Sequence, residues 1–128
     1  MKELTRAEEQ IMHVLWELGK AFVKDIVQRM SEPKPAYNTV STVVRILEKK
    51  GFVSHKAYGK TYEYFPAVSK EKYTKLFMQN FVKKYFKDSY QDMVSFFAKD
   101  RNLTIGELEE IKKMIVEEIQ KQKRGKDG

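Results

Sequence analysis

A helix, a glycine and a hairpin follow one another over residues 36–65, and this order constrains the fold more than any other feature. The segment AYNTVSTVVRILEKK has the apolar spacing of an amphipathic helix, and Gly51 follows as a stop signal. Two alternating segments, FVSHKAY and TYEYF, come next, with Gly59 in the turn between them. In a small basic chain, this order predicts a DNA recognition helix followed by a β-hairpin wing.

The predicted helix, from about Tyr37 to Lys50, has two chemically different sides. Three valines and Leu47 form its apolar side. The opposite side carries short hydrogen-bonding groups, whereas an ordinary solvent-facing side would carry Glu, Lys and Gln. Short polar groups permit close approach to DNA and hydrogen bonds to phosphates or base edges. The residues of this helix expected to contact DNA are Tyr37, Asn38, Thr39, Ser41, Thr42 and Arg45.

Positive charge is concentrated on the same part of the chain. Residues 34–60 contain six Lys or Arg and a single acid, Glu48, in a protein whose net charge is +7. Such an excess provides affinity for DNA that does not depend on base sequence. At the wing, we expect Lys56, Tyr58 and Lys60 to contact the DNA backbone.

The remainder of the first part has the pattern of a small helical domain, residues 1–68. A first helix begins at the capping box Thr5-Arg6-Ala7-Glu8 and ends at Gly19. A second, short helix is expected over about Val23–Met30. The apolar stripe predicted for the first helix, with Trp16 as an additional core residue, comprises Ala7, Ile11, Val14, Leu15 and Leu18.

Residues 69–128 are predicted to be a helical dimerisation region. Helices are expected over residues 69–86 and 89–98, and a third begins at the capping box Thr104-Ile105-Gly106-Glu107 and ends in a frayed basic segment, Lys121–Lys126. So short a region cannot cover its own apolar faces, and a second copy of the chain is the simplest partner. The residues expected in the dimer interface are Phe77, Phe81, Phe97, Leu108, Ile111 and Ile115.

Several functional classes find no support in the sequence. The chain has no cysteine, and its two histidines, His13 and His55, lack a surrounding carboxylate pattern, so neither a metal site nor a cofactor is expected. It has no Gly-rich phosphate loop, no G-x-S-x-G and no H-E-x-x-H, so we do not expect an enzyme. We also expect neither a signal peptide nor a membrane-inserted segment, which makes the cytoplasm the default location.

Three segments resemble the penicillinase repressor family, the BlaI/MecI/CopY-type transcription regulators: LTRAEEQIMHVLW, AYNTVSTVVRILEKKGFV and AYGKTYEYFP. The resemblance is dense over residues 4–68 and continues to about residue 119. It implies a mainly α-helical fold with a small β-hairpin wing, that is, a winged helix-turn-helix domain followed by a helical dimerisation region. It further implies a homodimeric repressor that binds palindromic operators with TACA/TGTA-type dyads in double-stranded DNA.

The resemblance also carries an expectation about regulation. Repressors of the β-lactam branch control β-lactamase or methicillin-resistance genes, and a sensor-activated protease cuts them at an Asn-Phe bond ahead of Ala-Lys. The matching stretch here has Phe96 in place of Asn, while Phe97, Ala98 and Lys99 agree, so Phe96–Phe97 is the expected position of any cut. The copper-responsive branch carries a C-terminal cysteine cluster that this chain lacks. The alternative to a DNA-binding repressor is a winged-helix module that binds protein.

Overall fold

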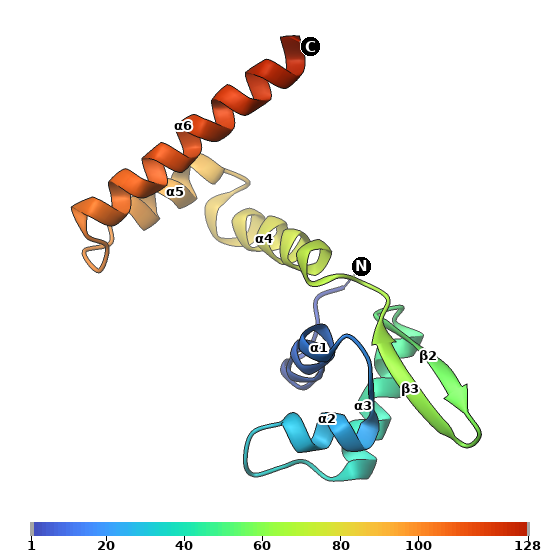
Figure 1. Cartoon of the computed structure of the whole chain (residues 1–128). Coiled ribbons are helices and arrows are strands. Elements are labelled where there is room, and N and C mark those ends of the chain that lie inside the picture. The colour runs from blue at the N-terminus through green and yellow to red at the C-terminus, as the bar shows by residue number, and fades with distance from the viewer. Residues whose placement is uncertain (1, 128) are drawn as a thin grey trace. The chain divides into compact units, whose positions relative to one another are not determined.

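The computed structural model describes residues 2–127, which form two compact units, one ending at Asn80 and the other beginning at Phe81. The first unit contains three helices, a small sheet and the start of a fourth helix (Figure 1). Its elements are α1 (Arg6–Leu18), β1 (Ala21–Phe22), α2 (Val23–Arg29), α3 (Tyr37–Lys49), β2 (Val53–Tyr58), β3 (Thr61–Pro66) and the first part of α4 (Lys70–Phe86). This is the mainly helical fold with a hairpin wing that the sequence predicts.

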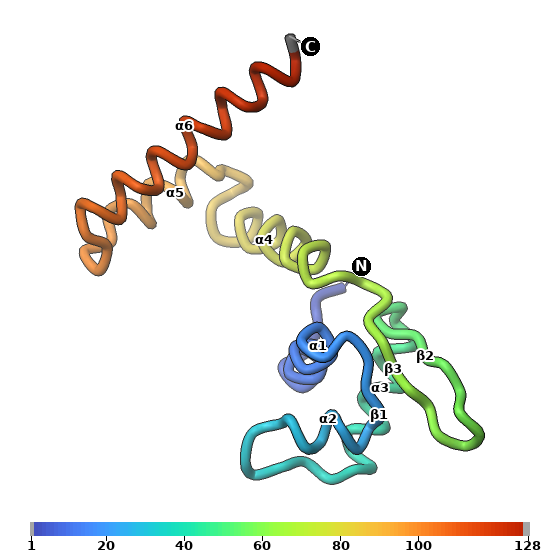
Figure 2. Tube along the Cα trace, in the orientation of Figure 1, coloured from blue at the N-terminus to red at the C-terminus, as the bar shows by residue number. Residues whose placement is uncertain are grey.

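The wing belongs to a three-stranded antiparallel sheet in the order β1-β3-β2. Strands β2 and β3 pair from Val53↔Pro66 to Tyr58↔Thr61, and the trace in Figure 2 shows the hairpin projecting from the helices. Gly59 has a φ of 64° in the turn, a conformation that glycine adopts without steric cost. The third strand, β1, was not predicted because two residues are too few to show strand alternation.

Helix α1 begins where the capping box predicts. Thr5 accepts a hydrogen bond from the backbone N–H of Glu8, whose carboxylate accepts one from the N–H of Thr5. The predicted apolar stripe is partly wrong, because Ala7 is exposed and Met12 is fully buried. The buried face of α1 is therefore displaced by about one residue from the predicted stripe, and it includes one acid, Glu8.

The core of the first unit forms where α1, α2, α3 and the sheet meet. Its centre consists of fully buried aliphatic and aromatic side chains. Helix α3 contributes one buried side chain from each successive turn, namely Val40, Val44 and Leu47. The predicted inward residue Val43 is only partly buried at the edge of this cluster. Burying one such side chain stabilises the fold by about 1.5–3 kcal/mol. Other fully buried residues of this cluster include Ile11, Leu15, Ile26 and Phe52.

Polar contacts fix the ends of α3 and α4 to the N-terminal segment. The ammonium of Lys50 lies 2.7 Å and 3.0 Å from the two carboxylate oxygens of Glu8. The hydroxyl of Tyr73 on α4 accepts a hydrogen bond from the backbone N–H of Leu4 at 2.9 Å. The indole N–H of Trp16, which is only partly buried, donates to the carbonyl of Val68 at 2.9 Å. These contacts explain why the compact unit extends beyond Ser69 into α4.

The second unit contains the end of α4, α5 (Tyr90–Ala98) and α6 (Ile105–Asp127). The predicted capping box is present, since Thr104 and Glu107 each bond to the other's backbone N–H at 3.0–3.1 Å. The predicted frayed end is not observed, because α6 continues as a helix through Lys121–Lys126. Among the described residues from Phe81 onward, Val82 is the one fully buried apolar side chain. No helix within residues 2–127 combines the length and apolarity needed to cross a membrane.

The Glu8–Lys50 pair makes the stability of the first unit depend on pH. Burial of Glu8 raises the pKa of its carboxyl, but hydrogen bonds from Lys50 and Thr5 outweigh burial, so the net pKa lies below the ordinary value of 4.5. A carboxyl whose folded-state pKa is lowered stabilises the fold above its unfolded-state pKa, and that contribution is lost as pH falls through the folded-state pKa.

We therefore expect Glu8→Gln to lower the free energy of unfolding by about 1–3 kcal/mol at neutral pH, because it removes the charge partner of Lys50. The difference from the wild type should shrink as pH falls from about 7 to about 3. Urea denaturation across this pH series measures it. Glu9→Gln is the matched control, since Glu9 is 42% exposed and lies 3.6 Å from His13, and it should change little. An equal loss at every pH would contradict this account of the pair.

Candidate nucleic-acid interface

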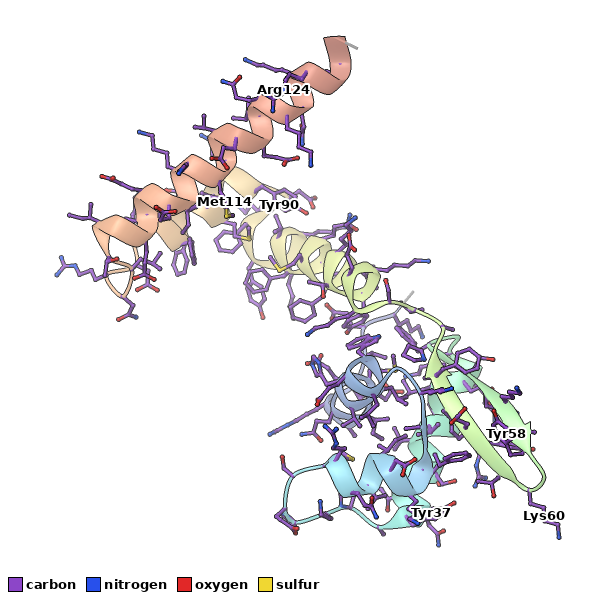
Figure 3. All side chains as sticks on the ribbon, viewed as in Figure 1. Tyr37, Tyr58, Lys60, Tyr90, Met114 and Arg124 are labelled. Carbon is purple, nitrogen blue, oxygen red and sulfur yellow. The ribbon has the colours of Figure 1, made fainter. Side chains whose placement is uncertain are left out.

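An open groove of about 910 Å³ lies between α3, the start of α2 and the wing. Three separate parts of the chain line it. They are Tyr37, Asn38, Ser41 and Arg45 from α3; Tyr58, Lys60, Thr61, Tyr62 and Tyr64 from the hairpin; and Phe22, Val23, Lys24 and Asp25 from the β1–α2 junction. Figure 3 shows Tyr37 at the beginning of α3 and Lys60 at the tip of the wing.

The structure brings together six of the nine residues predicted to contact DNA. Of the remaining three, Thr39 and Thr42 are exposed on α3 outside the groove. The hydroxyl of Thr42 donates to the carbonyl of Asn38 at 2.9 Å, one helical turn earlier. Lys56 lies on the wing with its ammonium 5.3 Å from the ring centre of Tyr58. All three residues are exposed but do not line the groove.

Ser41 and Arg45 act together on α3. Ser41 is only 8% exposed, so its expected position on the open polar side is wrong. Its hydroxyl accepts a hydrogen bond from one guanidinium nitrogen of Arg45 at 2.9 Å. Arg45 is exposed, and the bond directs its guanidinium along the groove side of α3. A guanidinium held in this way retains further N–H donors for a phosphate or a base edge.

The beginning of α3 also favours an anionic partner. Its N-cap residue, Ala36, provides no side-chain hydrogen bond to the first turn, and Tyr37, which follows, is 56% exposed. The first backbone N–H groups of a helix have no partner within the helix, and the helix dipole is positive there. This end of a helix is therefore suited to a phosphate group.

Several groove residues were missed by the sequence analysis. Phe22 contacts Tyr58 edge to face, with ring centres 6.0 Å apart, and Lys24 lies beside it at the start of α2. Tyr62 and Tyr64 come from the strand that the sequence did predict, and their alternation in TYEYF was the available signal. Phe22 and Lys24 carried no such signal, because only the fold places β1 against the wing.

Not all of the positive charge predicted for this region is available at the groove. The ammonium of Lys34 donates to the carbonyls of Gln28 and Met30 at 2.7 and 2.9 Å, at the C-terminal end of α2. Lys50 is paired with Glu8. Two of the six cations thus stabilise the fold, while Arg45 and Lys60 line the groove. The described part of the chain contains no cluster of three His, Cys, Asp or Glu residues that could hold a metal.

Apolar side chains are also exposed on the helices after the wing, in each of the two units. Of the predicted interface residues, Phe77, Phe97 and Ile115 are 40–47% exposed, whereas Phe81, Leu108 and Ile111 are partly buried. The most exposed apolar residues of these helices, Phe96, Ile105 and Met114 at 67–77%, were not among the predicted interface residues. Figure 3 shows Met114 on α6. The apolar surface of the second unit is therefore larger than predicted.

Three packed helices, the last of which is α3, and a hairpin wing define a winged helix-turn-helix protein with a helical C-terminal region. The family model described as "Penicillinase repressor" matches residues 4–117. The chain belongs to the penicillinase repressor family, a family of transcriptional repressors.

Individual proteins and one solved structure are similar to this chain. The methicillin resistance regulatory protein MecI of Staphylococcus aureus is 25% identical over 114 residues, which are 88% of this chain and 93% of the relative. The penicillinase repressor of Bacillus licheniformis is 21% identical and covers 94% of this chain and 95% of its own length. The solution structure of the DNA-binding domain of the repressor BlaI has 25% identity and a TM-score of 0.48, and covers 57% of this chain and 94% of that domain.

Proposed function

We propose that this chain is a homodimeric, cytoplasmic repressor that binds palindromic operator DNA through α3 and the wing, without enzymatic activity. The observation that carries the proposal is the groove itself, where Arg45, Lys60 and four tyrosines from distant parts of the chain converge. Cations supply attraction to phosphates, while phenol, amide and guanidinium groups supply directed hydrogen bonds. Direct base contacts belong to α3, because a major groove admits a helix.

The dimer follows from the composition of the second unit. A unit in which Val82 is the single buried apolar residue among those described does not stabilise itself, because burial of apolar surface is the main favourable contribution to folding. Exposed Phe97, Met114 and Ile115 provide the surface that a second copy would cover. Two copies place two recognition helices on one DNA duplex, which matches a dyad-symmetric operator.

The target genes and the mechanism that relieves repression are proposed from the similarity to known repressors. Relatives named for methicillin resistance and penicillinase favour β-lactam resistance genes. Operators with TACA/TGTA-type dyads are proposed from the resemblance of the sequence motifs alone. We further propose relief of repression by a sensor-activated protease that cuts at Phe96–Phe97. These residues lie in the last turn of α5, and Phe96 is 73% exposed. A cut there separates α6 from the rest of the interface, so the dimer would dissociate. Each released monomer would bind one half-site and lose the affinity gained by linking two DNA-binding domains.

The first test of DNA binding is its dependence on salt. If a dimer contacts 6–10 phosphates, affinity for duplex DNA should fall roughly 10³–10⁵-fold between about 50 and 200 mM salt. Fluorescence anisotropy with a labelled TACA/TGTA dyad and with a scrambled duplex measures this slope. Affinity that stays constant over the range would remove the DNA-binding proposal and favour a winged-helix module that binds protein.

The second test separates base reading from phosphate contact. Arg45→Ala should weaken operator binding by about 1–3 kcal/mol and reduce discrimination against the scrambled duplex, whereas Lys60→Ala should weaken both duplexes alike. Lys20→Ala is a matched control, because Lys20 is exposed and lies outside the groove. Equal losses on both duplexes for Arg45→Ala would show that Arg45 contacts only the backbone.

The third test concerns the dimer. Ile115→Glu places a charge on the exposed apolar face of α6, and in a symmetric dimer the change occurs twice, so the dimer dissociation constant should rise at least about 100-fold. Sedimentation equilibrium measures it, and operator affinity should fall in parallel. Gln120→Glu adds the same charge at an exposed polar position of α6 and should leave the dimer intact. A dimer of unchanged stability in Ile115→Glu would place the interface elsewhere.

A further inference from the structure

His55 forms a contact between the wing and the recognition helix. Its Nδ1 lies 2.6 Å from Oε2 of Glu48, which is in the last turn of α3. The imidazole ring also stacks on Tyr62, with ring centres 4.1 Å apart and planes 14° from parallel. It lies 5.7 Å from the ring of Tyr64. Both tyrosines line the groove, so His55 is held directly behind the proposed DNA-binding surface.

Glu48 is the one acid among residues 34–60, and it lies on the helix that is proposed to approach DNA. Its carboxylate is 32% exposed, and its partner on the wing is His55, at 29%. A carboxylate near DNA is repelled by phosphates, because like charges raise each other's energy when solvent screens them incompletely. A protonated His55 neutralises this charge, whereas a neutral His55 leaves it in place.

The other charged and titratable groups around the ring come from α3 and from both strands of the wing. From α3, Arg45 accompanies Glu48; from β3, Tyr62 and Tyr64 face the ring; and on β2 the neighbour is Lys56. Burial, and then the charge of Glu48, raise the pKa of the Tyr64 hydroxyl above 10.0, so that phenol stays neutral. Histidine is the side chain that ordinarily changes charge between about pH 5 and 8. Of this cluster, only His55 is therefore expected to act as a proton switch.

We infer that His55 couples operator binding to proton uptake, so that the repressor holds DNA more tightly at mildly acidic pH and releases it as pH rises. The inference rests on the proposed function and specifies a regulation of the same surface. The sign follows from linkage: the negative field of bound DNA favours the protonated imidazole, so binding takes up protons and weakens when they become scarce. Because the dimer has two such sites, the effect is doubled.

The experiment measures the dissociation constant of the full-length dimer for a TACA/TGTA dyad between about pH 6 and pH 8 at constant ionic strength. We expect affinity to fall across this range by about tenfold per protomer, which corresponds to about 1.4 kcal/mol each. His55→Gln retains a hydrogen-bonding group beside Glu48 but cannot be protonated. It should give a flat profile close to the wild type at the upper end of the range.

Two further variants sharpen the test. Glu48→Gln removes the repelling charge, so it should bind several-fold more tightly than the wild type at about pH 8 and show a smaller pH dependence. His13→Gln changes the other histidine, which lies on α1 beside Glu9 and Trp16 and outside the groove, so the wild-type profile should remain. A flat wild-type profile, an unchanged slope in His55→Gln, or a slope lost in His13→Gln would each overturn the inference.

A second measurement protects the test against misfolding of the variants. The imidazole proton resonances of His55 can be followed by NMR in the intact wild-type dimer, free and bound to operator. The inference requires the midpoint of the His55 titration to move to higher pH on DNA, and an unmoved midpoint would overturn it. Failure of the proposed function looks different, because the chain would then bind no duplex at any pH.

Discussion

The burial of one side of α3 is the constraint on which the other features depend. Its sequence is rich in Thr and Val, which are weaker helix formers than Ala, Leu or Glu, so the isolated segment has little tendency to be helical. The helix exists because Val40, Val44 and Leu47 are removed from water in the core. That packing fixes the rotation of α3 about its axis and thereby decides which residues face the groove. Ser41 illustrates the consequence, because the same rotation brings it almost out of solvent.

Polar contacts then limit how the neighbouring elements can move. The N-terminal segment is tied to the end of α3 through Glu8 and Lys50, and to α4 through Leu4 and Tyr73. The wing is tied to α3 through His55 and Glu48. Each tie uses a polar group that apolar neighbours partly enclose, where an ion pair or hydrogen bond is stronger than in water but costs more when one partner is lost. Helix α3 is thus connected to the wing directly and to the start of α4 through the N-terminal segment.

The helical region after the wing is built on a different principle. Side chains cap the beginnings of α5 and α6, but Val82 is the one described side chain from Phe81 onward that is fully buried and apolar. Helices of this length gain little from local propensity and depend on burying an apolar face. A face that stays exposed in one chain is a surface for association, and large exposed apolar patches generally indicate such sites. If this helical region is stable only in a dimer, dissociation of the dimer and loss of the proposed DNA binding would occur together.

The order of the helices and the hairpin, the capping boxes at Thr5 and Thr104, the glycine after α3 and the hairpin turn were all determined by the sequence, because each depends on neighbours within a few residues. The family was recognisable for the same reason, since its motifs are short and local. The tertiary structure decided the rest. It placed Phe22 and Lys24 against the wing, buried Ser41 beneath Arg45, paired Glu8 with Lys50 and set His55 beside Glu48. These partners are separated by up to 42 residues, and their contact depends on how the helices pack, which no local pattern encodes.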